Sequence, residues 1–109
     1  MITAKKAFEK SKIGYDNYIN RVKEIVKNEL ENYIAEKIEI ATAAGHFFIF
    51  YWREFTWFAH QTIAPQDYIL ILGEKLQSLG YKIITIDGNK DIKIEIYWDQ
   101  EEEEEEDNG

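Results

Sequence analysis

Apolar residues recur every three or four positions over residues 15–44, with charged and amide side chains between them. This spacing predicts one long amphipathic helix, because positions three and four apart lie on the same side of an α-helix. Glu29 is among the charged residues expected on its polar side, and Gly45 is expected to end it in a left-handed conformation. The predicted apolar stripe consists of Tyr15, Tyr18, Ile19, Val22, Ile25, Val26, Leu30, Tyr33, Ile34, Ile38 and Ala41.

After Gly45 the pattern changes to a run of β-branched and aromatic residues over positions 47–52, which predicts a strand. Both alternating sets of this run are apolar, so both faces of the strand avoid water. Residues 53–63 continue the aromatic theme without an Asn-Gly or Asp-Gly turn. We therefore expect either a second strand that folds back or a packed aromatic loop over residues 53–63.

Pro65 suits the first turn of a second helix that ends before Gly80. Its predicted buried stripe contains Ile69, Leu72, Leu76 and Leu79. A β-hairpin is then predicted from residues 81–86, a turn at 87–90 and residues 91–98. In the last segment, polar or half-polar residues alternate with Ile92, Ile94, Ile96 and Trp98, as in a strand with one solvent-exposed face.

These elements predict a single α+β domain over residues 1–98, with a small antiparallel sheet of three or four strands and one long and one shorter helix on one face. Thr3 can cap a first helical segment over residues 4–12, and Gly14 is expected to separate it from the long helix. Residues 1–13 either pack back on the domain or reach out to a partner. Residues 99–109 are expected to form a disordered acidic tail.

The charge is unevenly distributed along the 109 residues. Asp99, Asp107 and the six glutamates at 101–106 account for eight of the 21 acidic residues, and the remaining 13 equal the number of Lys and Arg. The folded body is therefore nearly neutral, which argues against direct nucleic-acid binding. The chain has no cysteine and no apolar run long enough to cross a membrane, so we expect a soluble protein in a cytoplasm.

No catalytic, cofactor-binding or metal-binding constellation is recognisable. The two histidines, His46 and His60, lack a third ligand at a defined spacing. Asp87, Asn89 and Asp91 resemble the start of a calcium loop, but the required later glycine and glutamate are missing, which favours a hairpin turn. We therefore predict a protein without enzymatic activity.

The strongest functional candidates are aromatic side chains, which serve either as core residues or as anchors of a protein interface. Base stacking on the same rings is disfavoured by the surrounding charge. A small-molecule pocket lined by Tyr51, Trp57 and His60 is a further alternative. The candidate interface residues are Phe48, Phe50, Trp52, Phe55, Trp57 and Phe58.

Several short sequence segments of the chain resemble segments of small, mostly uncharacterised α+β proteins encoded by tailed bacteriophages. They are Ile-Thr-Ala-Lys-Lys-Ala at 2–7, Ile-Ala at 40–41 with Ala-Gly at 44–45, Leu-Gln-Ser-Leu-Gly-Tyr-Lys-Ile at 76–83, and Ile-Glu-Ile-Tyr-Trp at 94–98. The chain departs from this pattern over residues 53–63 and in the acidic tail. The resemblance implies a non-enzymatic role, either as a virion component or as an early protein that acts on the host, and it brings no catalytic residues.

Two functional hypotheses follow. In the first, the protein is a phage-type structural or assembly protein that oligomerises or docks on a protein partner, in the host cytoplasm or in a virion. In the second, it is an inhibitor whose acidic tail occupies a basic, nucleic-acid-binding surface of a host protein.

Overall fold

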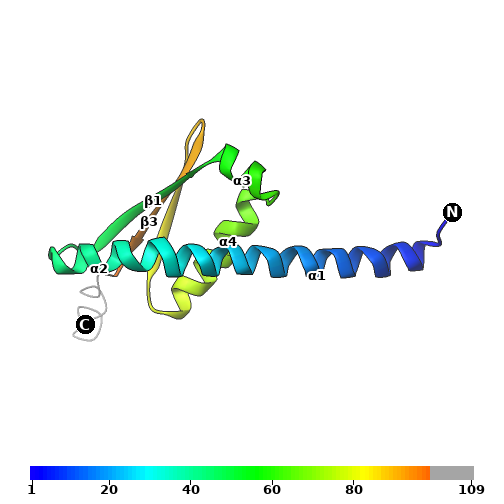
Figure 1. Ribbon diagram of the computed structural model, residues 1–109, viewed down its shortest axis with the longest axis horizontal. Helices are drawn as coiled ribbons and strands as arrows, with labels where there is room; N and C mark the ends of the chain where they lie inside the picture. Colours follow the sequence, from blue (N-terminus) through cyan, green and yellow to red (C-terminus); the bar gives the residue numbers. More distant parts are fainter. Residues whose placement is uncertain (99–109) are drawn as a thin grey trace, which may run out of the picture.

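A computed structural model describes residues 1–98 of the chain (Figure 1). The expected disordered tail, residues 99–109, lies outside the described residues. Three helical segments run head to tail in one long rod: α1 (Ala4–Glu29), the π-helical turn η1 (Leu30–Ile34) and α2 (Ala35–Ala43). The remaining elements are β1 (Phe48–Glu54), α3 (Phe55–Gln61), α4 (Pro65–Ser78), β2 (Lys82–Asp87) and β3 (Asp91–Tyr97).

The three strands form an antiparallel sheet in the order β1-β3-β2, which leaves β1 at one edge. Ile92, Ile94 and Ile96 of the central strand β3 are buried, as their alternation predicts. Ile49 and Tyr51 of β1 are buried in the adjoining rows of the same face, under the helices. The predicted α+β class, with an antiparallel sheet and a helical layer, is confirmed.

The core lies between this sheet face, the rod and α4. Burying each large apolar side chain contributes about 1.5–3 kcal/mol, so the buried side chains of this core supply most of the favourable free energy of folding. The largest fully buried side chains are Tyr68, Phe58, Ile34, Leu72, Leu76, Ile94, Ile96, Val22 and Val26.

The π turn corrects the rotational phase of the rod. Val22, Val26 and Glu29 are buried, and in a regular helix the next position on their side would be Tyr33, which is instead 53% exposed. The π turn takes up one additional residue, so Ile34, rather than Tyr33, points into the core with 0% exposure. The predicted stripe was therefore wrong at Tyr33 because it assumed an uninterrupted α-helix.

One predicted helix boundary and one predicted core residue were also wrong. Gly14 lies inside α1, which is continuous from Thr3, whose Oγ1 accepts a hydrogen bond from the Lys6 N–H at 3.2 Å. One interior glycine costs only about 1 kcal/mol, which does not divide a helix that is anchored further along. Leu79, expected in the core, is 64% exposed because α4 ends at Ser78.

Residues 53–63 form neither a second strand nor an aromatic loop: residues 53–54 end β1, and Phe55–Gln61 form the helix α3. The Phe55 N–H still donates to the Lys90 carbonyl at 2.8 Å, at the point where β1 ends. The helix then turns Phe58 into the core, with 1% exposure. Thr62, in a left-handed conformation with φ 54°, ends α3 and leads into α4.

Candidate protein-interaction surface

The alternation along β1 places its second set of aromatic residues on the sheet face that the helices leave uncovered. Phe48, Phe50 and Trp52 are 42%, 36% and 55% exposed, whereas Ile49 and Tyr51 between them are 8% and 4% exposed. A strand alternates its side chains between the two faces of a sheet, so a helical layer on one face cannot cover both sets.

Apolar residues recur on β2, at the other edge of this face, with Lys93 and Glu95 of the central strand β3 between them and β1. Ile84 shares a cross-strand row with Glu95 and Phe50, and Ile86 shares one with Lys93 and Trp52. Ile84 and Ile86 are 47% and 51% exposed. We call the surface formed by Phe48, Phe50, Trp52, Ile84 and Ile86 the outer face.

Two lysines lie over rings of the outer face. Lys93 Nζ is 4.2 Å from the ring centre of Phe50, and Lys37 Nζ of α2 is 5.8 Å from that of Trp52. Phe48 and Phe50 meet edge to face with their ring centres 5.4 Å apart. Such contacts favour defined ring orientations, so the outer face is an ordered aromatic surface.

An apolar groove of about 520 Å³ runs between α2 and the free edge of β1. Ile40 and Ala44 form its helical wall, and Phe48 and Phe50 form its strand wall. Lys37 and His46 also line the groove, which is otherwise apolar. The outer face therefore continues around the edge of the sheet onto the rod.

The other three candidate residues belong to α3 and are distributed differently. Phe55 is 36% exposed, and Phe58 is buried. Trp57 is half-buried, with its ring centre 5.1 Å from that of Phe58 and 5.5 Å from that of Tyr68. The six candidates thus divide into three outer-face residues of β1 and an α3 group that is partly core.

Beneath α3 lies a buried polar network that the sequence did not indicate. Glu29, expected on the polar side of the rod, is 5% exposed and forms an ion pair with Arg53. The Tyr51 hydroxyl donates to Glu29 Oε1 at 2.8 Å and accepts from Arg53 Nε at 2.9 Å. The Tyr51 and Tyr68 hydroxyl oxygens are 3.3 Å apart.

Aromatic rings enclose the cation of this network. The Arg53 guanidinium carbon lies 4.7 Å from the ring centre of Trp57, 5.3 Å from that of Tyr51 and 5.4 Å from that of Tyr33. Burial, followed by the negative charge of Glu29, raises the pKa of Tyr51 to about 12, and burial raises the pKa of Tyr68 as well. The two phenols therefore remain protonated at neutral pH and serve as hydrogen-bond donors.

This network includes Tyr51 and Trp57, two of the three residues of the alternative small-molecule pocket. Tyr51 is buried with its hydroxyl bonded on both sides, and Trp57 is packed against two rings and a guanidinium. His60, the third residue of that hypothesis, is exposed on α3. Tyr51 and Trp57 therefore join the rod, the sheet and α4, and we assign them no ligand.

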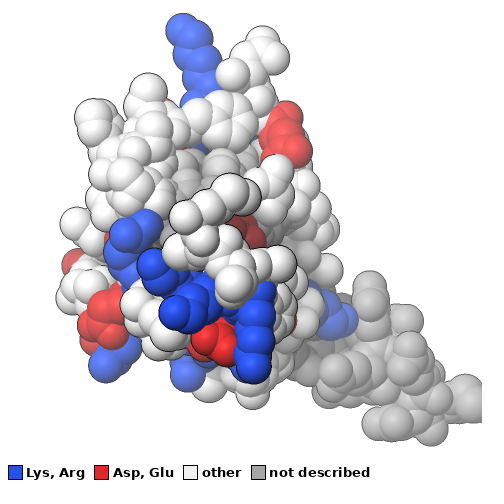
Figure 2. All heavy atoms as spheres, turned by 90° about the vertical axis from the view of Figure 1, so that its right-hand side faces the viewer, with Lys and Arg blue, Asp and Glu red and all other residues white. Residues whose placement is uncertain are grey.

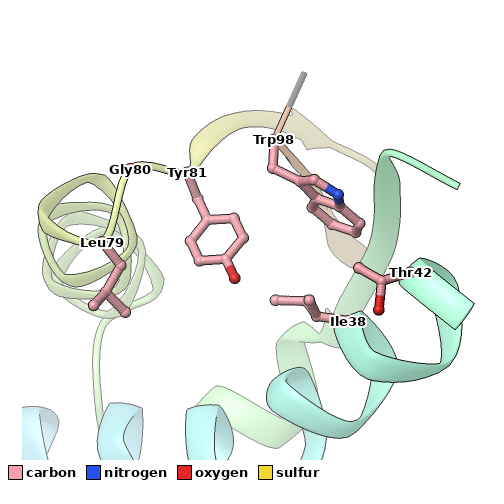
Figure 3. Close-up of a pocket in the computed structure, with 6 residues that line it drawn as sticks. All are labelled: Ile38, Thr42, Leu79, Gly80, Tyr81 and Trp98. Carbon is pink, nitrogen blue, oxygen red and sulfur yellow. The ribbon is translucent and has the colours of Figure 1, made fainter. Parts of the chain in front are cut away.

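A smaller hollow of about 240 Å³ lies at the far end of the rod (Figure 3). Figure 3 shows the Tyr81 hydroxyl directed toward Ile38, with Trp98 above and Leu79 to one side. The rings of Tyr81 and Trp98 meet edge to face, 6.0 Å between centres. Polar and apolar atoms line this hollow in similar proportion, and they do not indicate a chemistry.

Among residues 1–98, no group of three His, Asp or Glu side chains lies close enough together to hold a metal ion. In the same part of the chain, none of the helices combines the length and the apolar character needed to span a bilayer.

Comparison with known proteins finds no matching family model, no similar curated protein and no similar solved structure. The case for a function therefore rests on the residues of the chain itself.

Proposed function

We propose that this chain is a non-enzymatic structural or assembly protein that acts through protein–protein contacts made by the outer face. The observation that carries the proposal is the exposure of three successive outward-pointing aromatic residues on one strand, Phe48, Phe50 and Trp52. Contiguous exposed apolar surface is a mark of interaction sites, and aromatic residues are the usual anchors of interfaces.

The position of β1 supports the same role. It pairs with β3 on one side only, and its other edge borders the apolar groove. A partner can therefore contact outer-face rings and the groove together, with Lys37, Lys93 and Glu95 as charged groups on or beside the same surface. Partners with an apolar contact surface and charged groups of both signs fit this arrangement best.

The resemblance to bacteriophage proteins suggests a setting for this role, in a virion or in the host cytoplasm, with a protein partner or further copies of the chain bound. The alternative, in which the acidic segment inhibits a nucleic-acid-binding protein, depends on residues 99–109 and thus on the sequence alone.

Site-specific photo-crosslinking in the native source tests the proposal. A crosslinking residue at position 52 or 84 is expected to give a discrete product with a protein partner. Leu70, 61% exposed on α4, provides a control position that is equally apolar but lies on the helical side of the molecule.

The same partner should be lost on purification with Trp52→Asp or Ile84→Asp and retained with Leu70→Asp. All three side chains are exposed, so loss of folding does not explain a difference between them. Products at position 70 but not at 52 or 84 would count against the outer face as the interface.

A further inference from the structure

The N-terminal part of α1 projects beyond the rest of the molecule (Figure 1). Residues 1–17, which we call the arm, are all exposed except the half-buried Ala7. The first residue of α1 with a hydrogen bond to the body is Tyr18, whose hydroxyl donates to Asp67 Oδ2 at 2.7 Å and accepts from the Ala64 N–H at 2.9 Å. The helix thus continues well past the last contact that holds it.

The apolar stripe of the rod continues into the arm without anything to cover it. Val22 is completely buried, and Tyr15 and Phe8, which lie two helical turns apart on the same side, are 63% and 70% exposed. An isolated helix as short as the arm is marginal in water, so a stripe of this kind gains stability when it packs against a partner.

The arm is also basic. Lys5, Lys6, Lys10 and Lys12 outnumber its two acidic residues, Glu9 and Asp16, by two charges. Figure 2, viewed from the projecting end, shows Lys and Arg side chains gathered around that end of the molecule.

The opposite end of the rod has the complementary properties. The groove between α2 and β1 is apolar, and Ile40 on its helical wall is 63% exposed. Lys37 lines the groove, and the exposed Glu36 and Glu39 neighbour Ile40 on the same helix, an excess of one negative charge.

The acidic end of the chain begins near the same place. The Trp98 N–H donates to the Phe47 carbonyl at 3.0 Å, immediately before β1. Trp98 is the last described residue, and eight acidic residues follow it in the sequence. The described chain therefore ends close to the start of β1, and the acidic sequence follows from there.

We propose that a second copy of this chain fills the groove, with the arm of each copy lying in the α2–β1 groove of the other. Phe8 would provide the apolar contact with Ile40 and the groove, and the arm lysines would face Glu36 and Glu39 of the rod. This self-association shares Phe48 and Phe50 with the outer face, but it adds the arm and does not use Trp52, Ile84 or Ile86, so it goes beyond the proposed function.

Geometry favours exchange between two copies over a contact within one. The arm and the groove lie at opposite ends of a molecule that is 63 Å long, joined by one continuous helical rod, so the arm cannot reach its own groove. A two-fold axis perpendicular to the rod brings both arms to both grooves at once, which closes the assembly as a dimer.

Sedimentation equilibrium of the full chain tests this assembly. We expect a dimer that weakens as salt is added, and we expect Phe8→Asp and Ile40→Asp each to raise its dissociation constant about tenfold or more, since each buries a charge against apolar groups. Ile13→Asp is the matched control, because Ile13 is 62% exposed but lies about 140° around the helix from Phe8. A monomer at every concentration, or a dimer that both variants leave intact, overturns the proposal.

Crosslinking gives an independent test, because the chain contains no cysteine of its own. A mixture of Phe8→Cys and Ile40→Cys proteins is expected to form a mixed dimer with a short bis-maleimide, whereas Ile13→Cys with Ile40→Cys is not. Equal crosslinking of both mixtures, or none of either, overturns the proposal.

The two interfaces can be separated by variants of the far strand. Ile84 and Ile86 do not line the groove, so Ile84→Asp is expected to leave the dimer intact even where it abolishes binding of a partner protein. If Ile84→Asp dissociates the dimer and Phe8→Asp does not, self-association belongs to the outer face, and the arm proposal fails while the proposed function stands.

Discussion

Glu29 and Arg53 form an ion pair that joins the long helical rod to the edge strand β1. Their side chains are 7% and 25% exposed, so the carboxylate is withdrawn from water while the guanidinium keeps partial access to it. The hydroxyl of Tyr51 bonds to both partners, which satisfies the pair on the buried side. The pair therefore fixes the orientation of the strand that carries the outer face.

Arg53→Met is expected to lower the free energy of unfolding by about 3 kcal/mol, because it leaves the Glu29 carboxylate buried without a cation. This is the lower end of the range for buried pairs, in keeping with the partial exposure of Arg53. Urea denaturation measures the loss, with the exposed Glu31→Gln as control. The double variant Glu29→Leu with Arg53→Met should recover part of the loss, and no recovery would contradict a paired role for the two residues.

Alkaline pH should destabilise the fold through its buried phenols. The pKa of Tyr51 is raised from 10.0 to about 12, so below pH 10 its contribution to stability is fully present. As the pH rises from 10 toward 12, the unfolded chain loses a phenolic proton that folded Tyr51 retains, and stability falls by up to about 1.4 kcal/mol per pH unit for one such group. Tyr68, whose pKa is also raised by burial, adds to this fall.

Denaturation in urea at several alkaline pH values measures this dependence. Tyr51→Phe should show a shallower loss of stability than the wild-type chain, and the exposed Tyr15→Phe should show the same loss as the wild type. An equally steep loss in Tyr51→Phe would exclude the buried phenol as its source.

Deleting Asn32 from the π turn is expected to be tolerated. The deletion removes the additional residue, so the turn can become regular α-helix while Ile34 and Ala41 keep the side they share with Val26. Deleting Glu74 from α4 is the contrasting case, because it rotates Leu76 about 100° out of the core. Thermal unfolding followed by circular dichroism compares the two, and equal losses would show that η1 does not act as a phase correction.

Two glycines should respond oppositely to alanine. Gly14→Ala is expected to strengthen the arm helix by about 1 kcal/mol, since it removes a flexible interior residue and a Cβ there meets nothing within 4 Å. Gly45→Ala is expected to destabilise the chain by about 1 kcal/mol, because Gly45 has φ +80° at the end of the rod. Hydrogen exchange over residues 4–13 measures the first effect and thermal unfolding the second.

The elements with a clear period could be predicted from the sequence. The hairpin was predicted from the alternation of Ile92, Ile94 and Ile96, and the start of α4 from Pro65, because a two-residue or 3.6-residue period maps directly onto one buried face. The exposure of Phe48, Phe50 and Trp52 follows from the same alternation once a single helical layer is assumed.

What sequence reasoning missed depends on contacts between distant residues. Glu29 lies seven residues after the buried Val22, so helical spacing places it on the buried side and Glu31 on the opposite side. The partners that satisfy Glu29, Arg53 and Tyr51, come from another element and leave no local signal. The spacing of Phe55 and Phe58 was a usable signal for α3, since three residues is a helical interval and a strand would place them on opposite faces. The groove, similarly, arises only where α2 passes the edge of β1.

The π turn has an effect beyond the core. If a regular helix contained one additional residue, the side chains after that residue would be rotated by about 100° around the helix axis relative to those before it. Because η1 absorbs that residue, Phe8 near one end of the rod and Ala41 near the other share a single azimuth. The exposed apolar side of the arm and the buried side of α2 therefore face in similar directions. That relationship is set by the π turn, which is far from the arm.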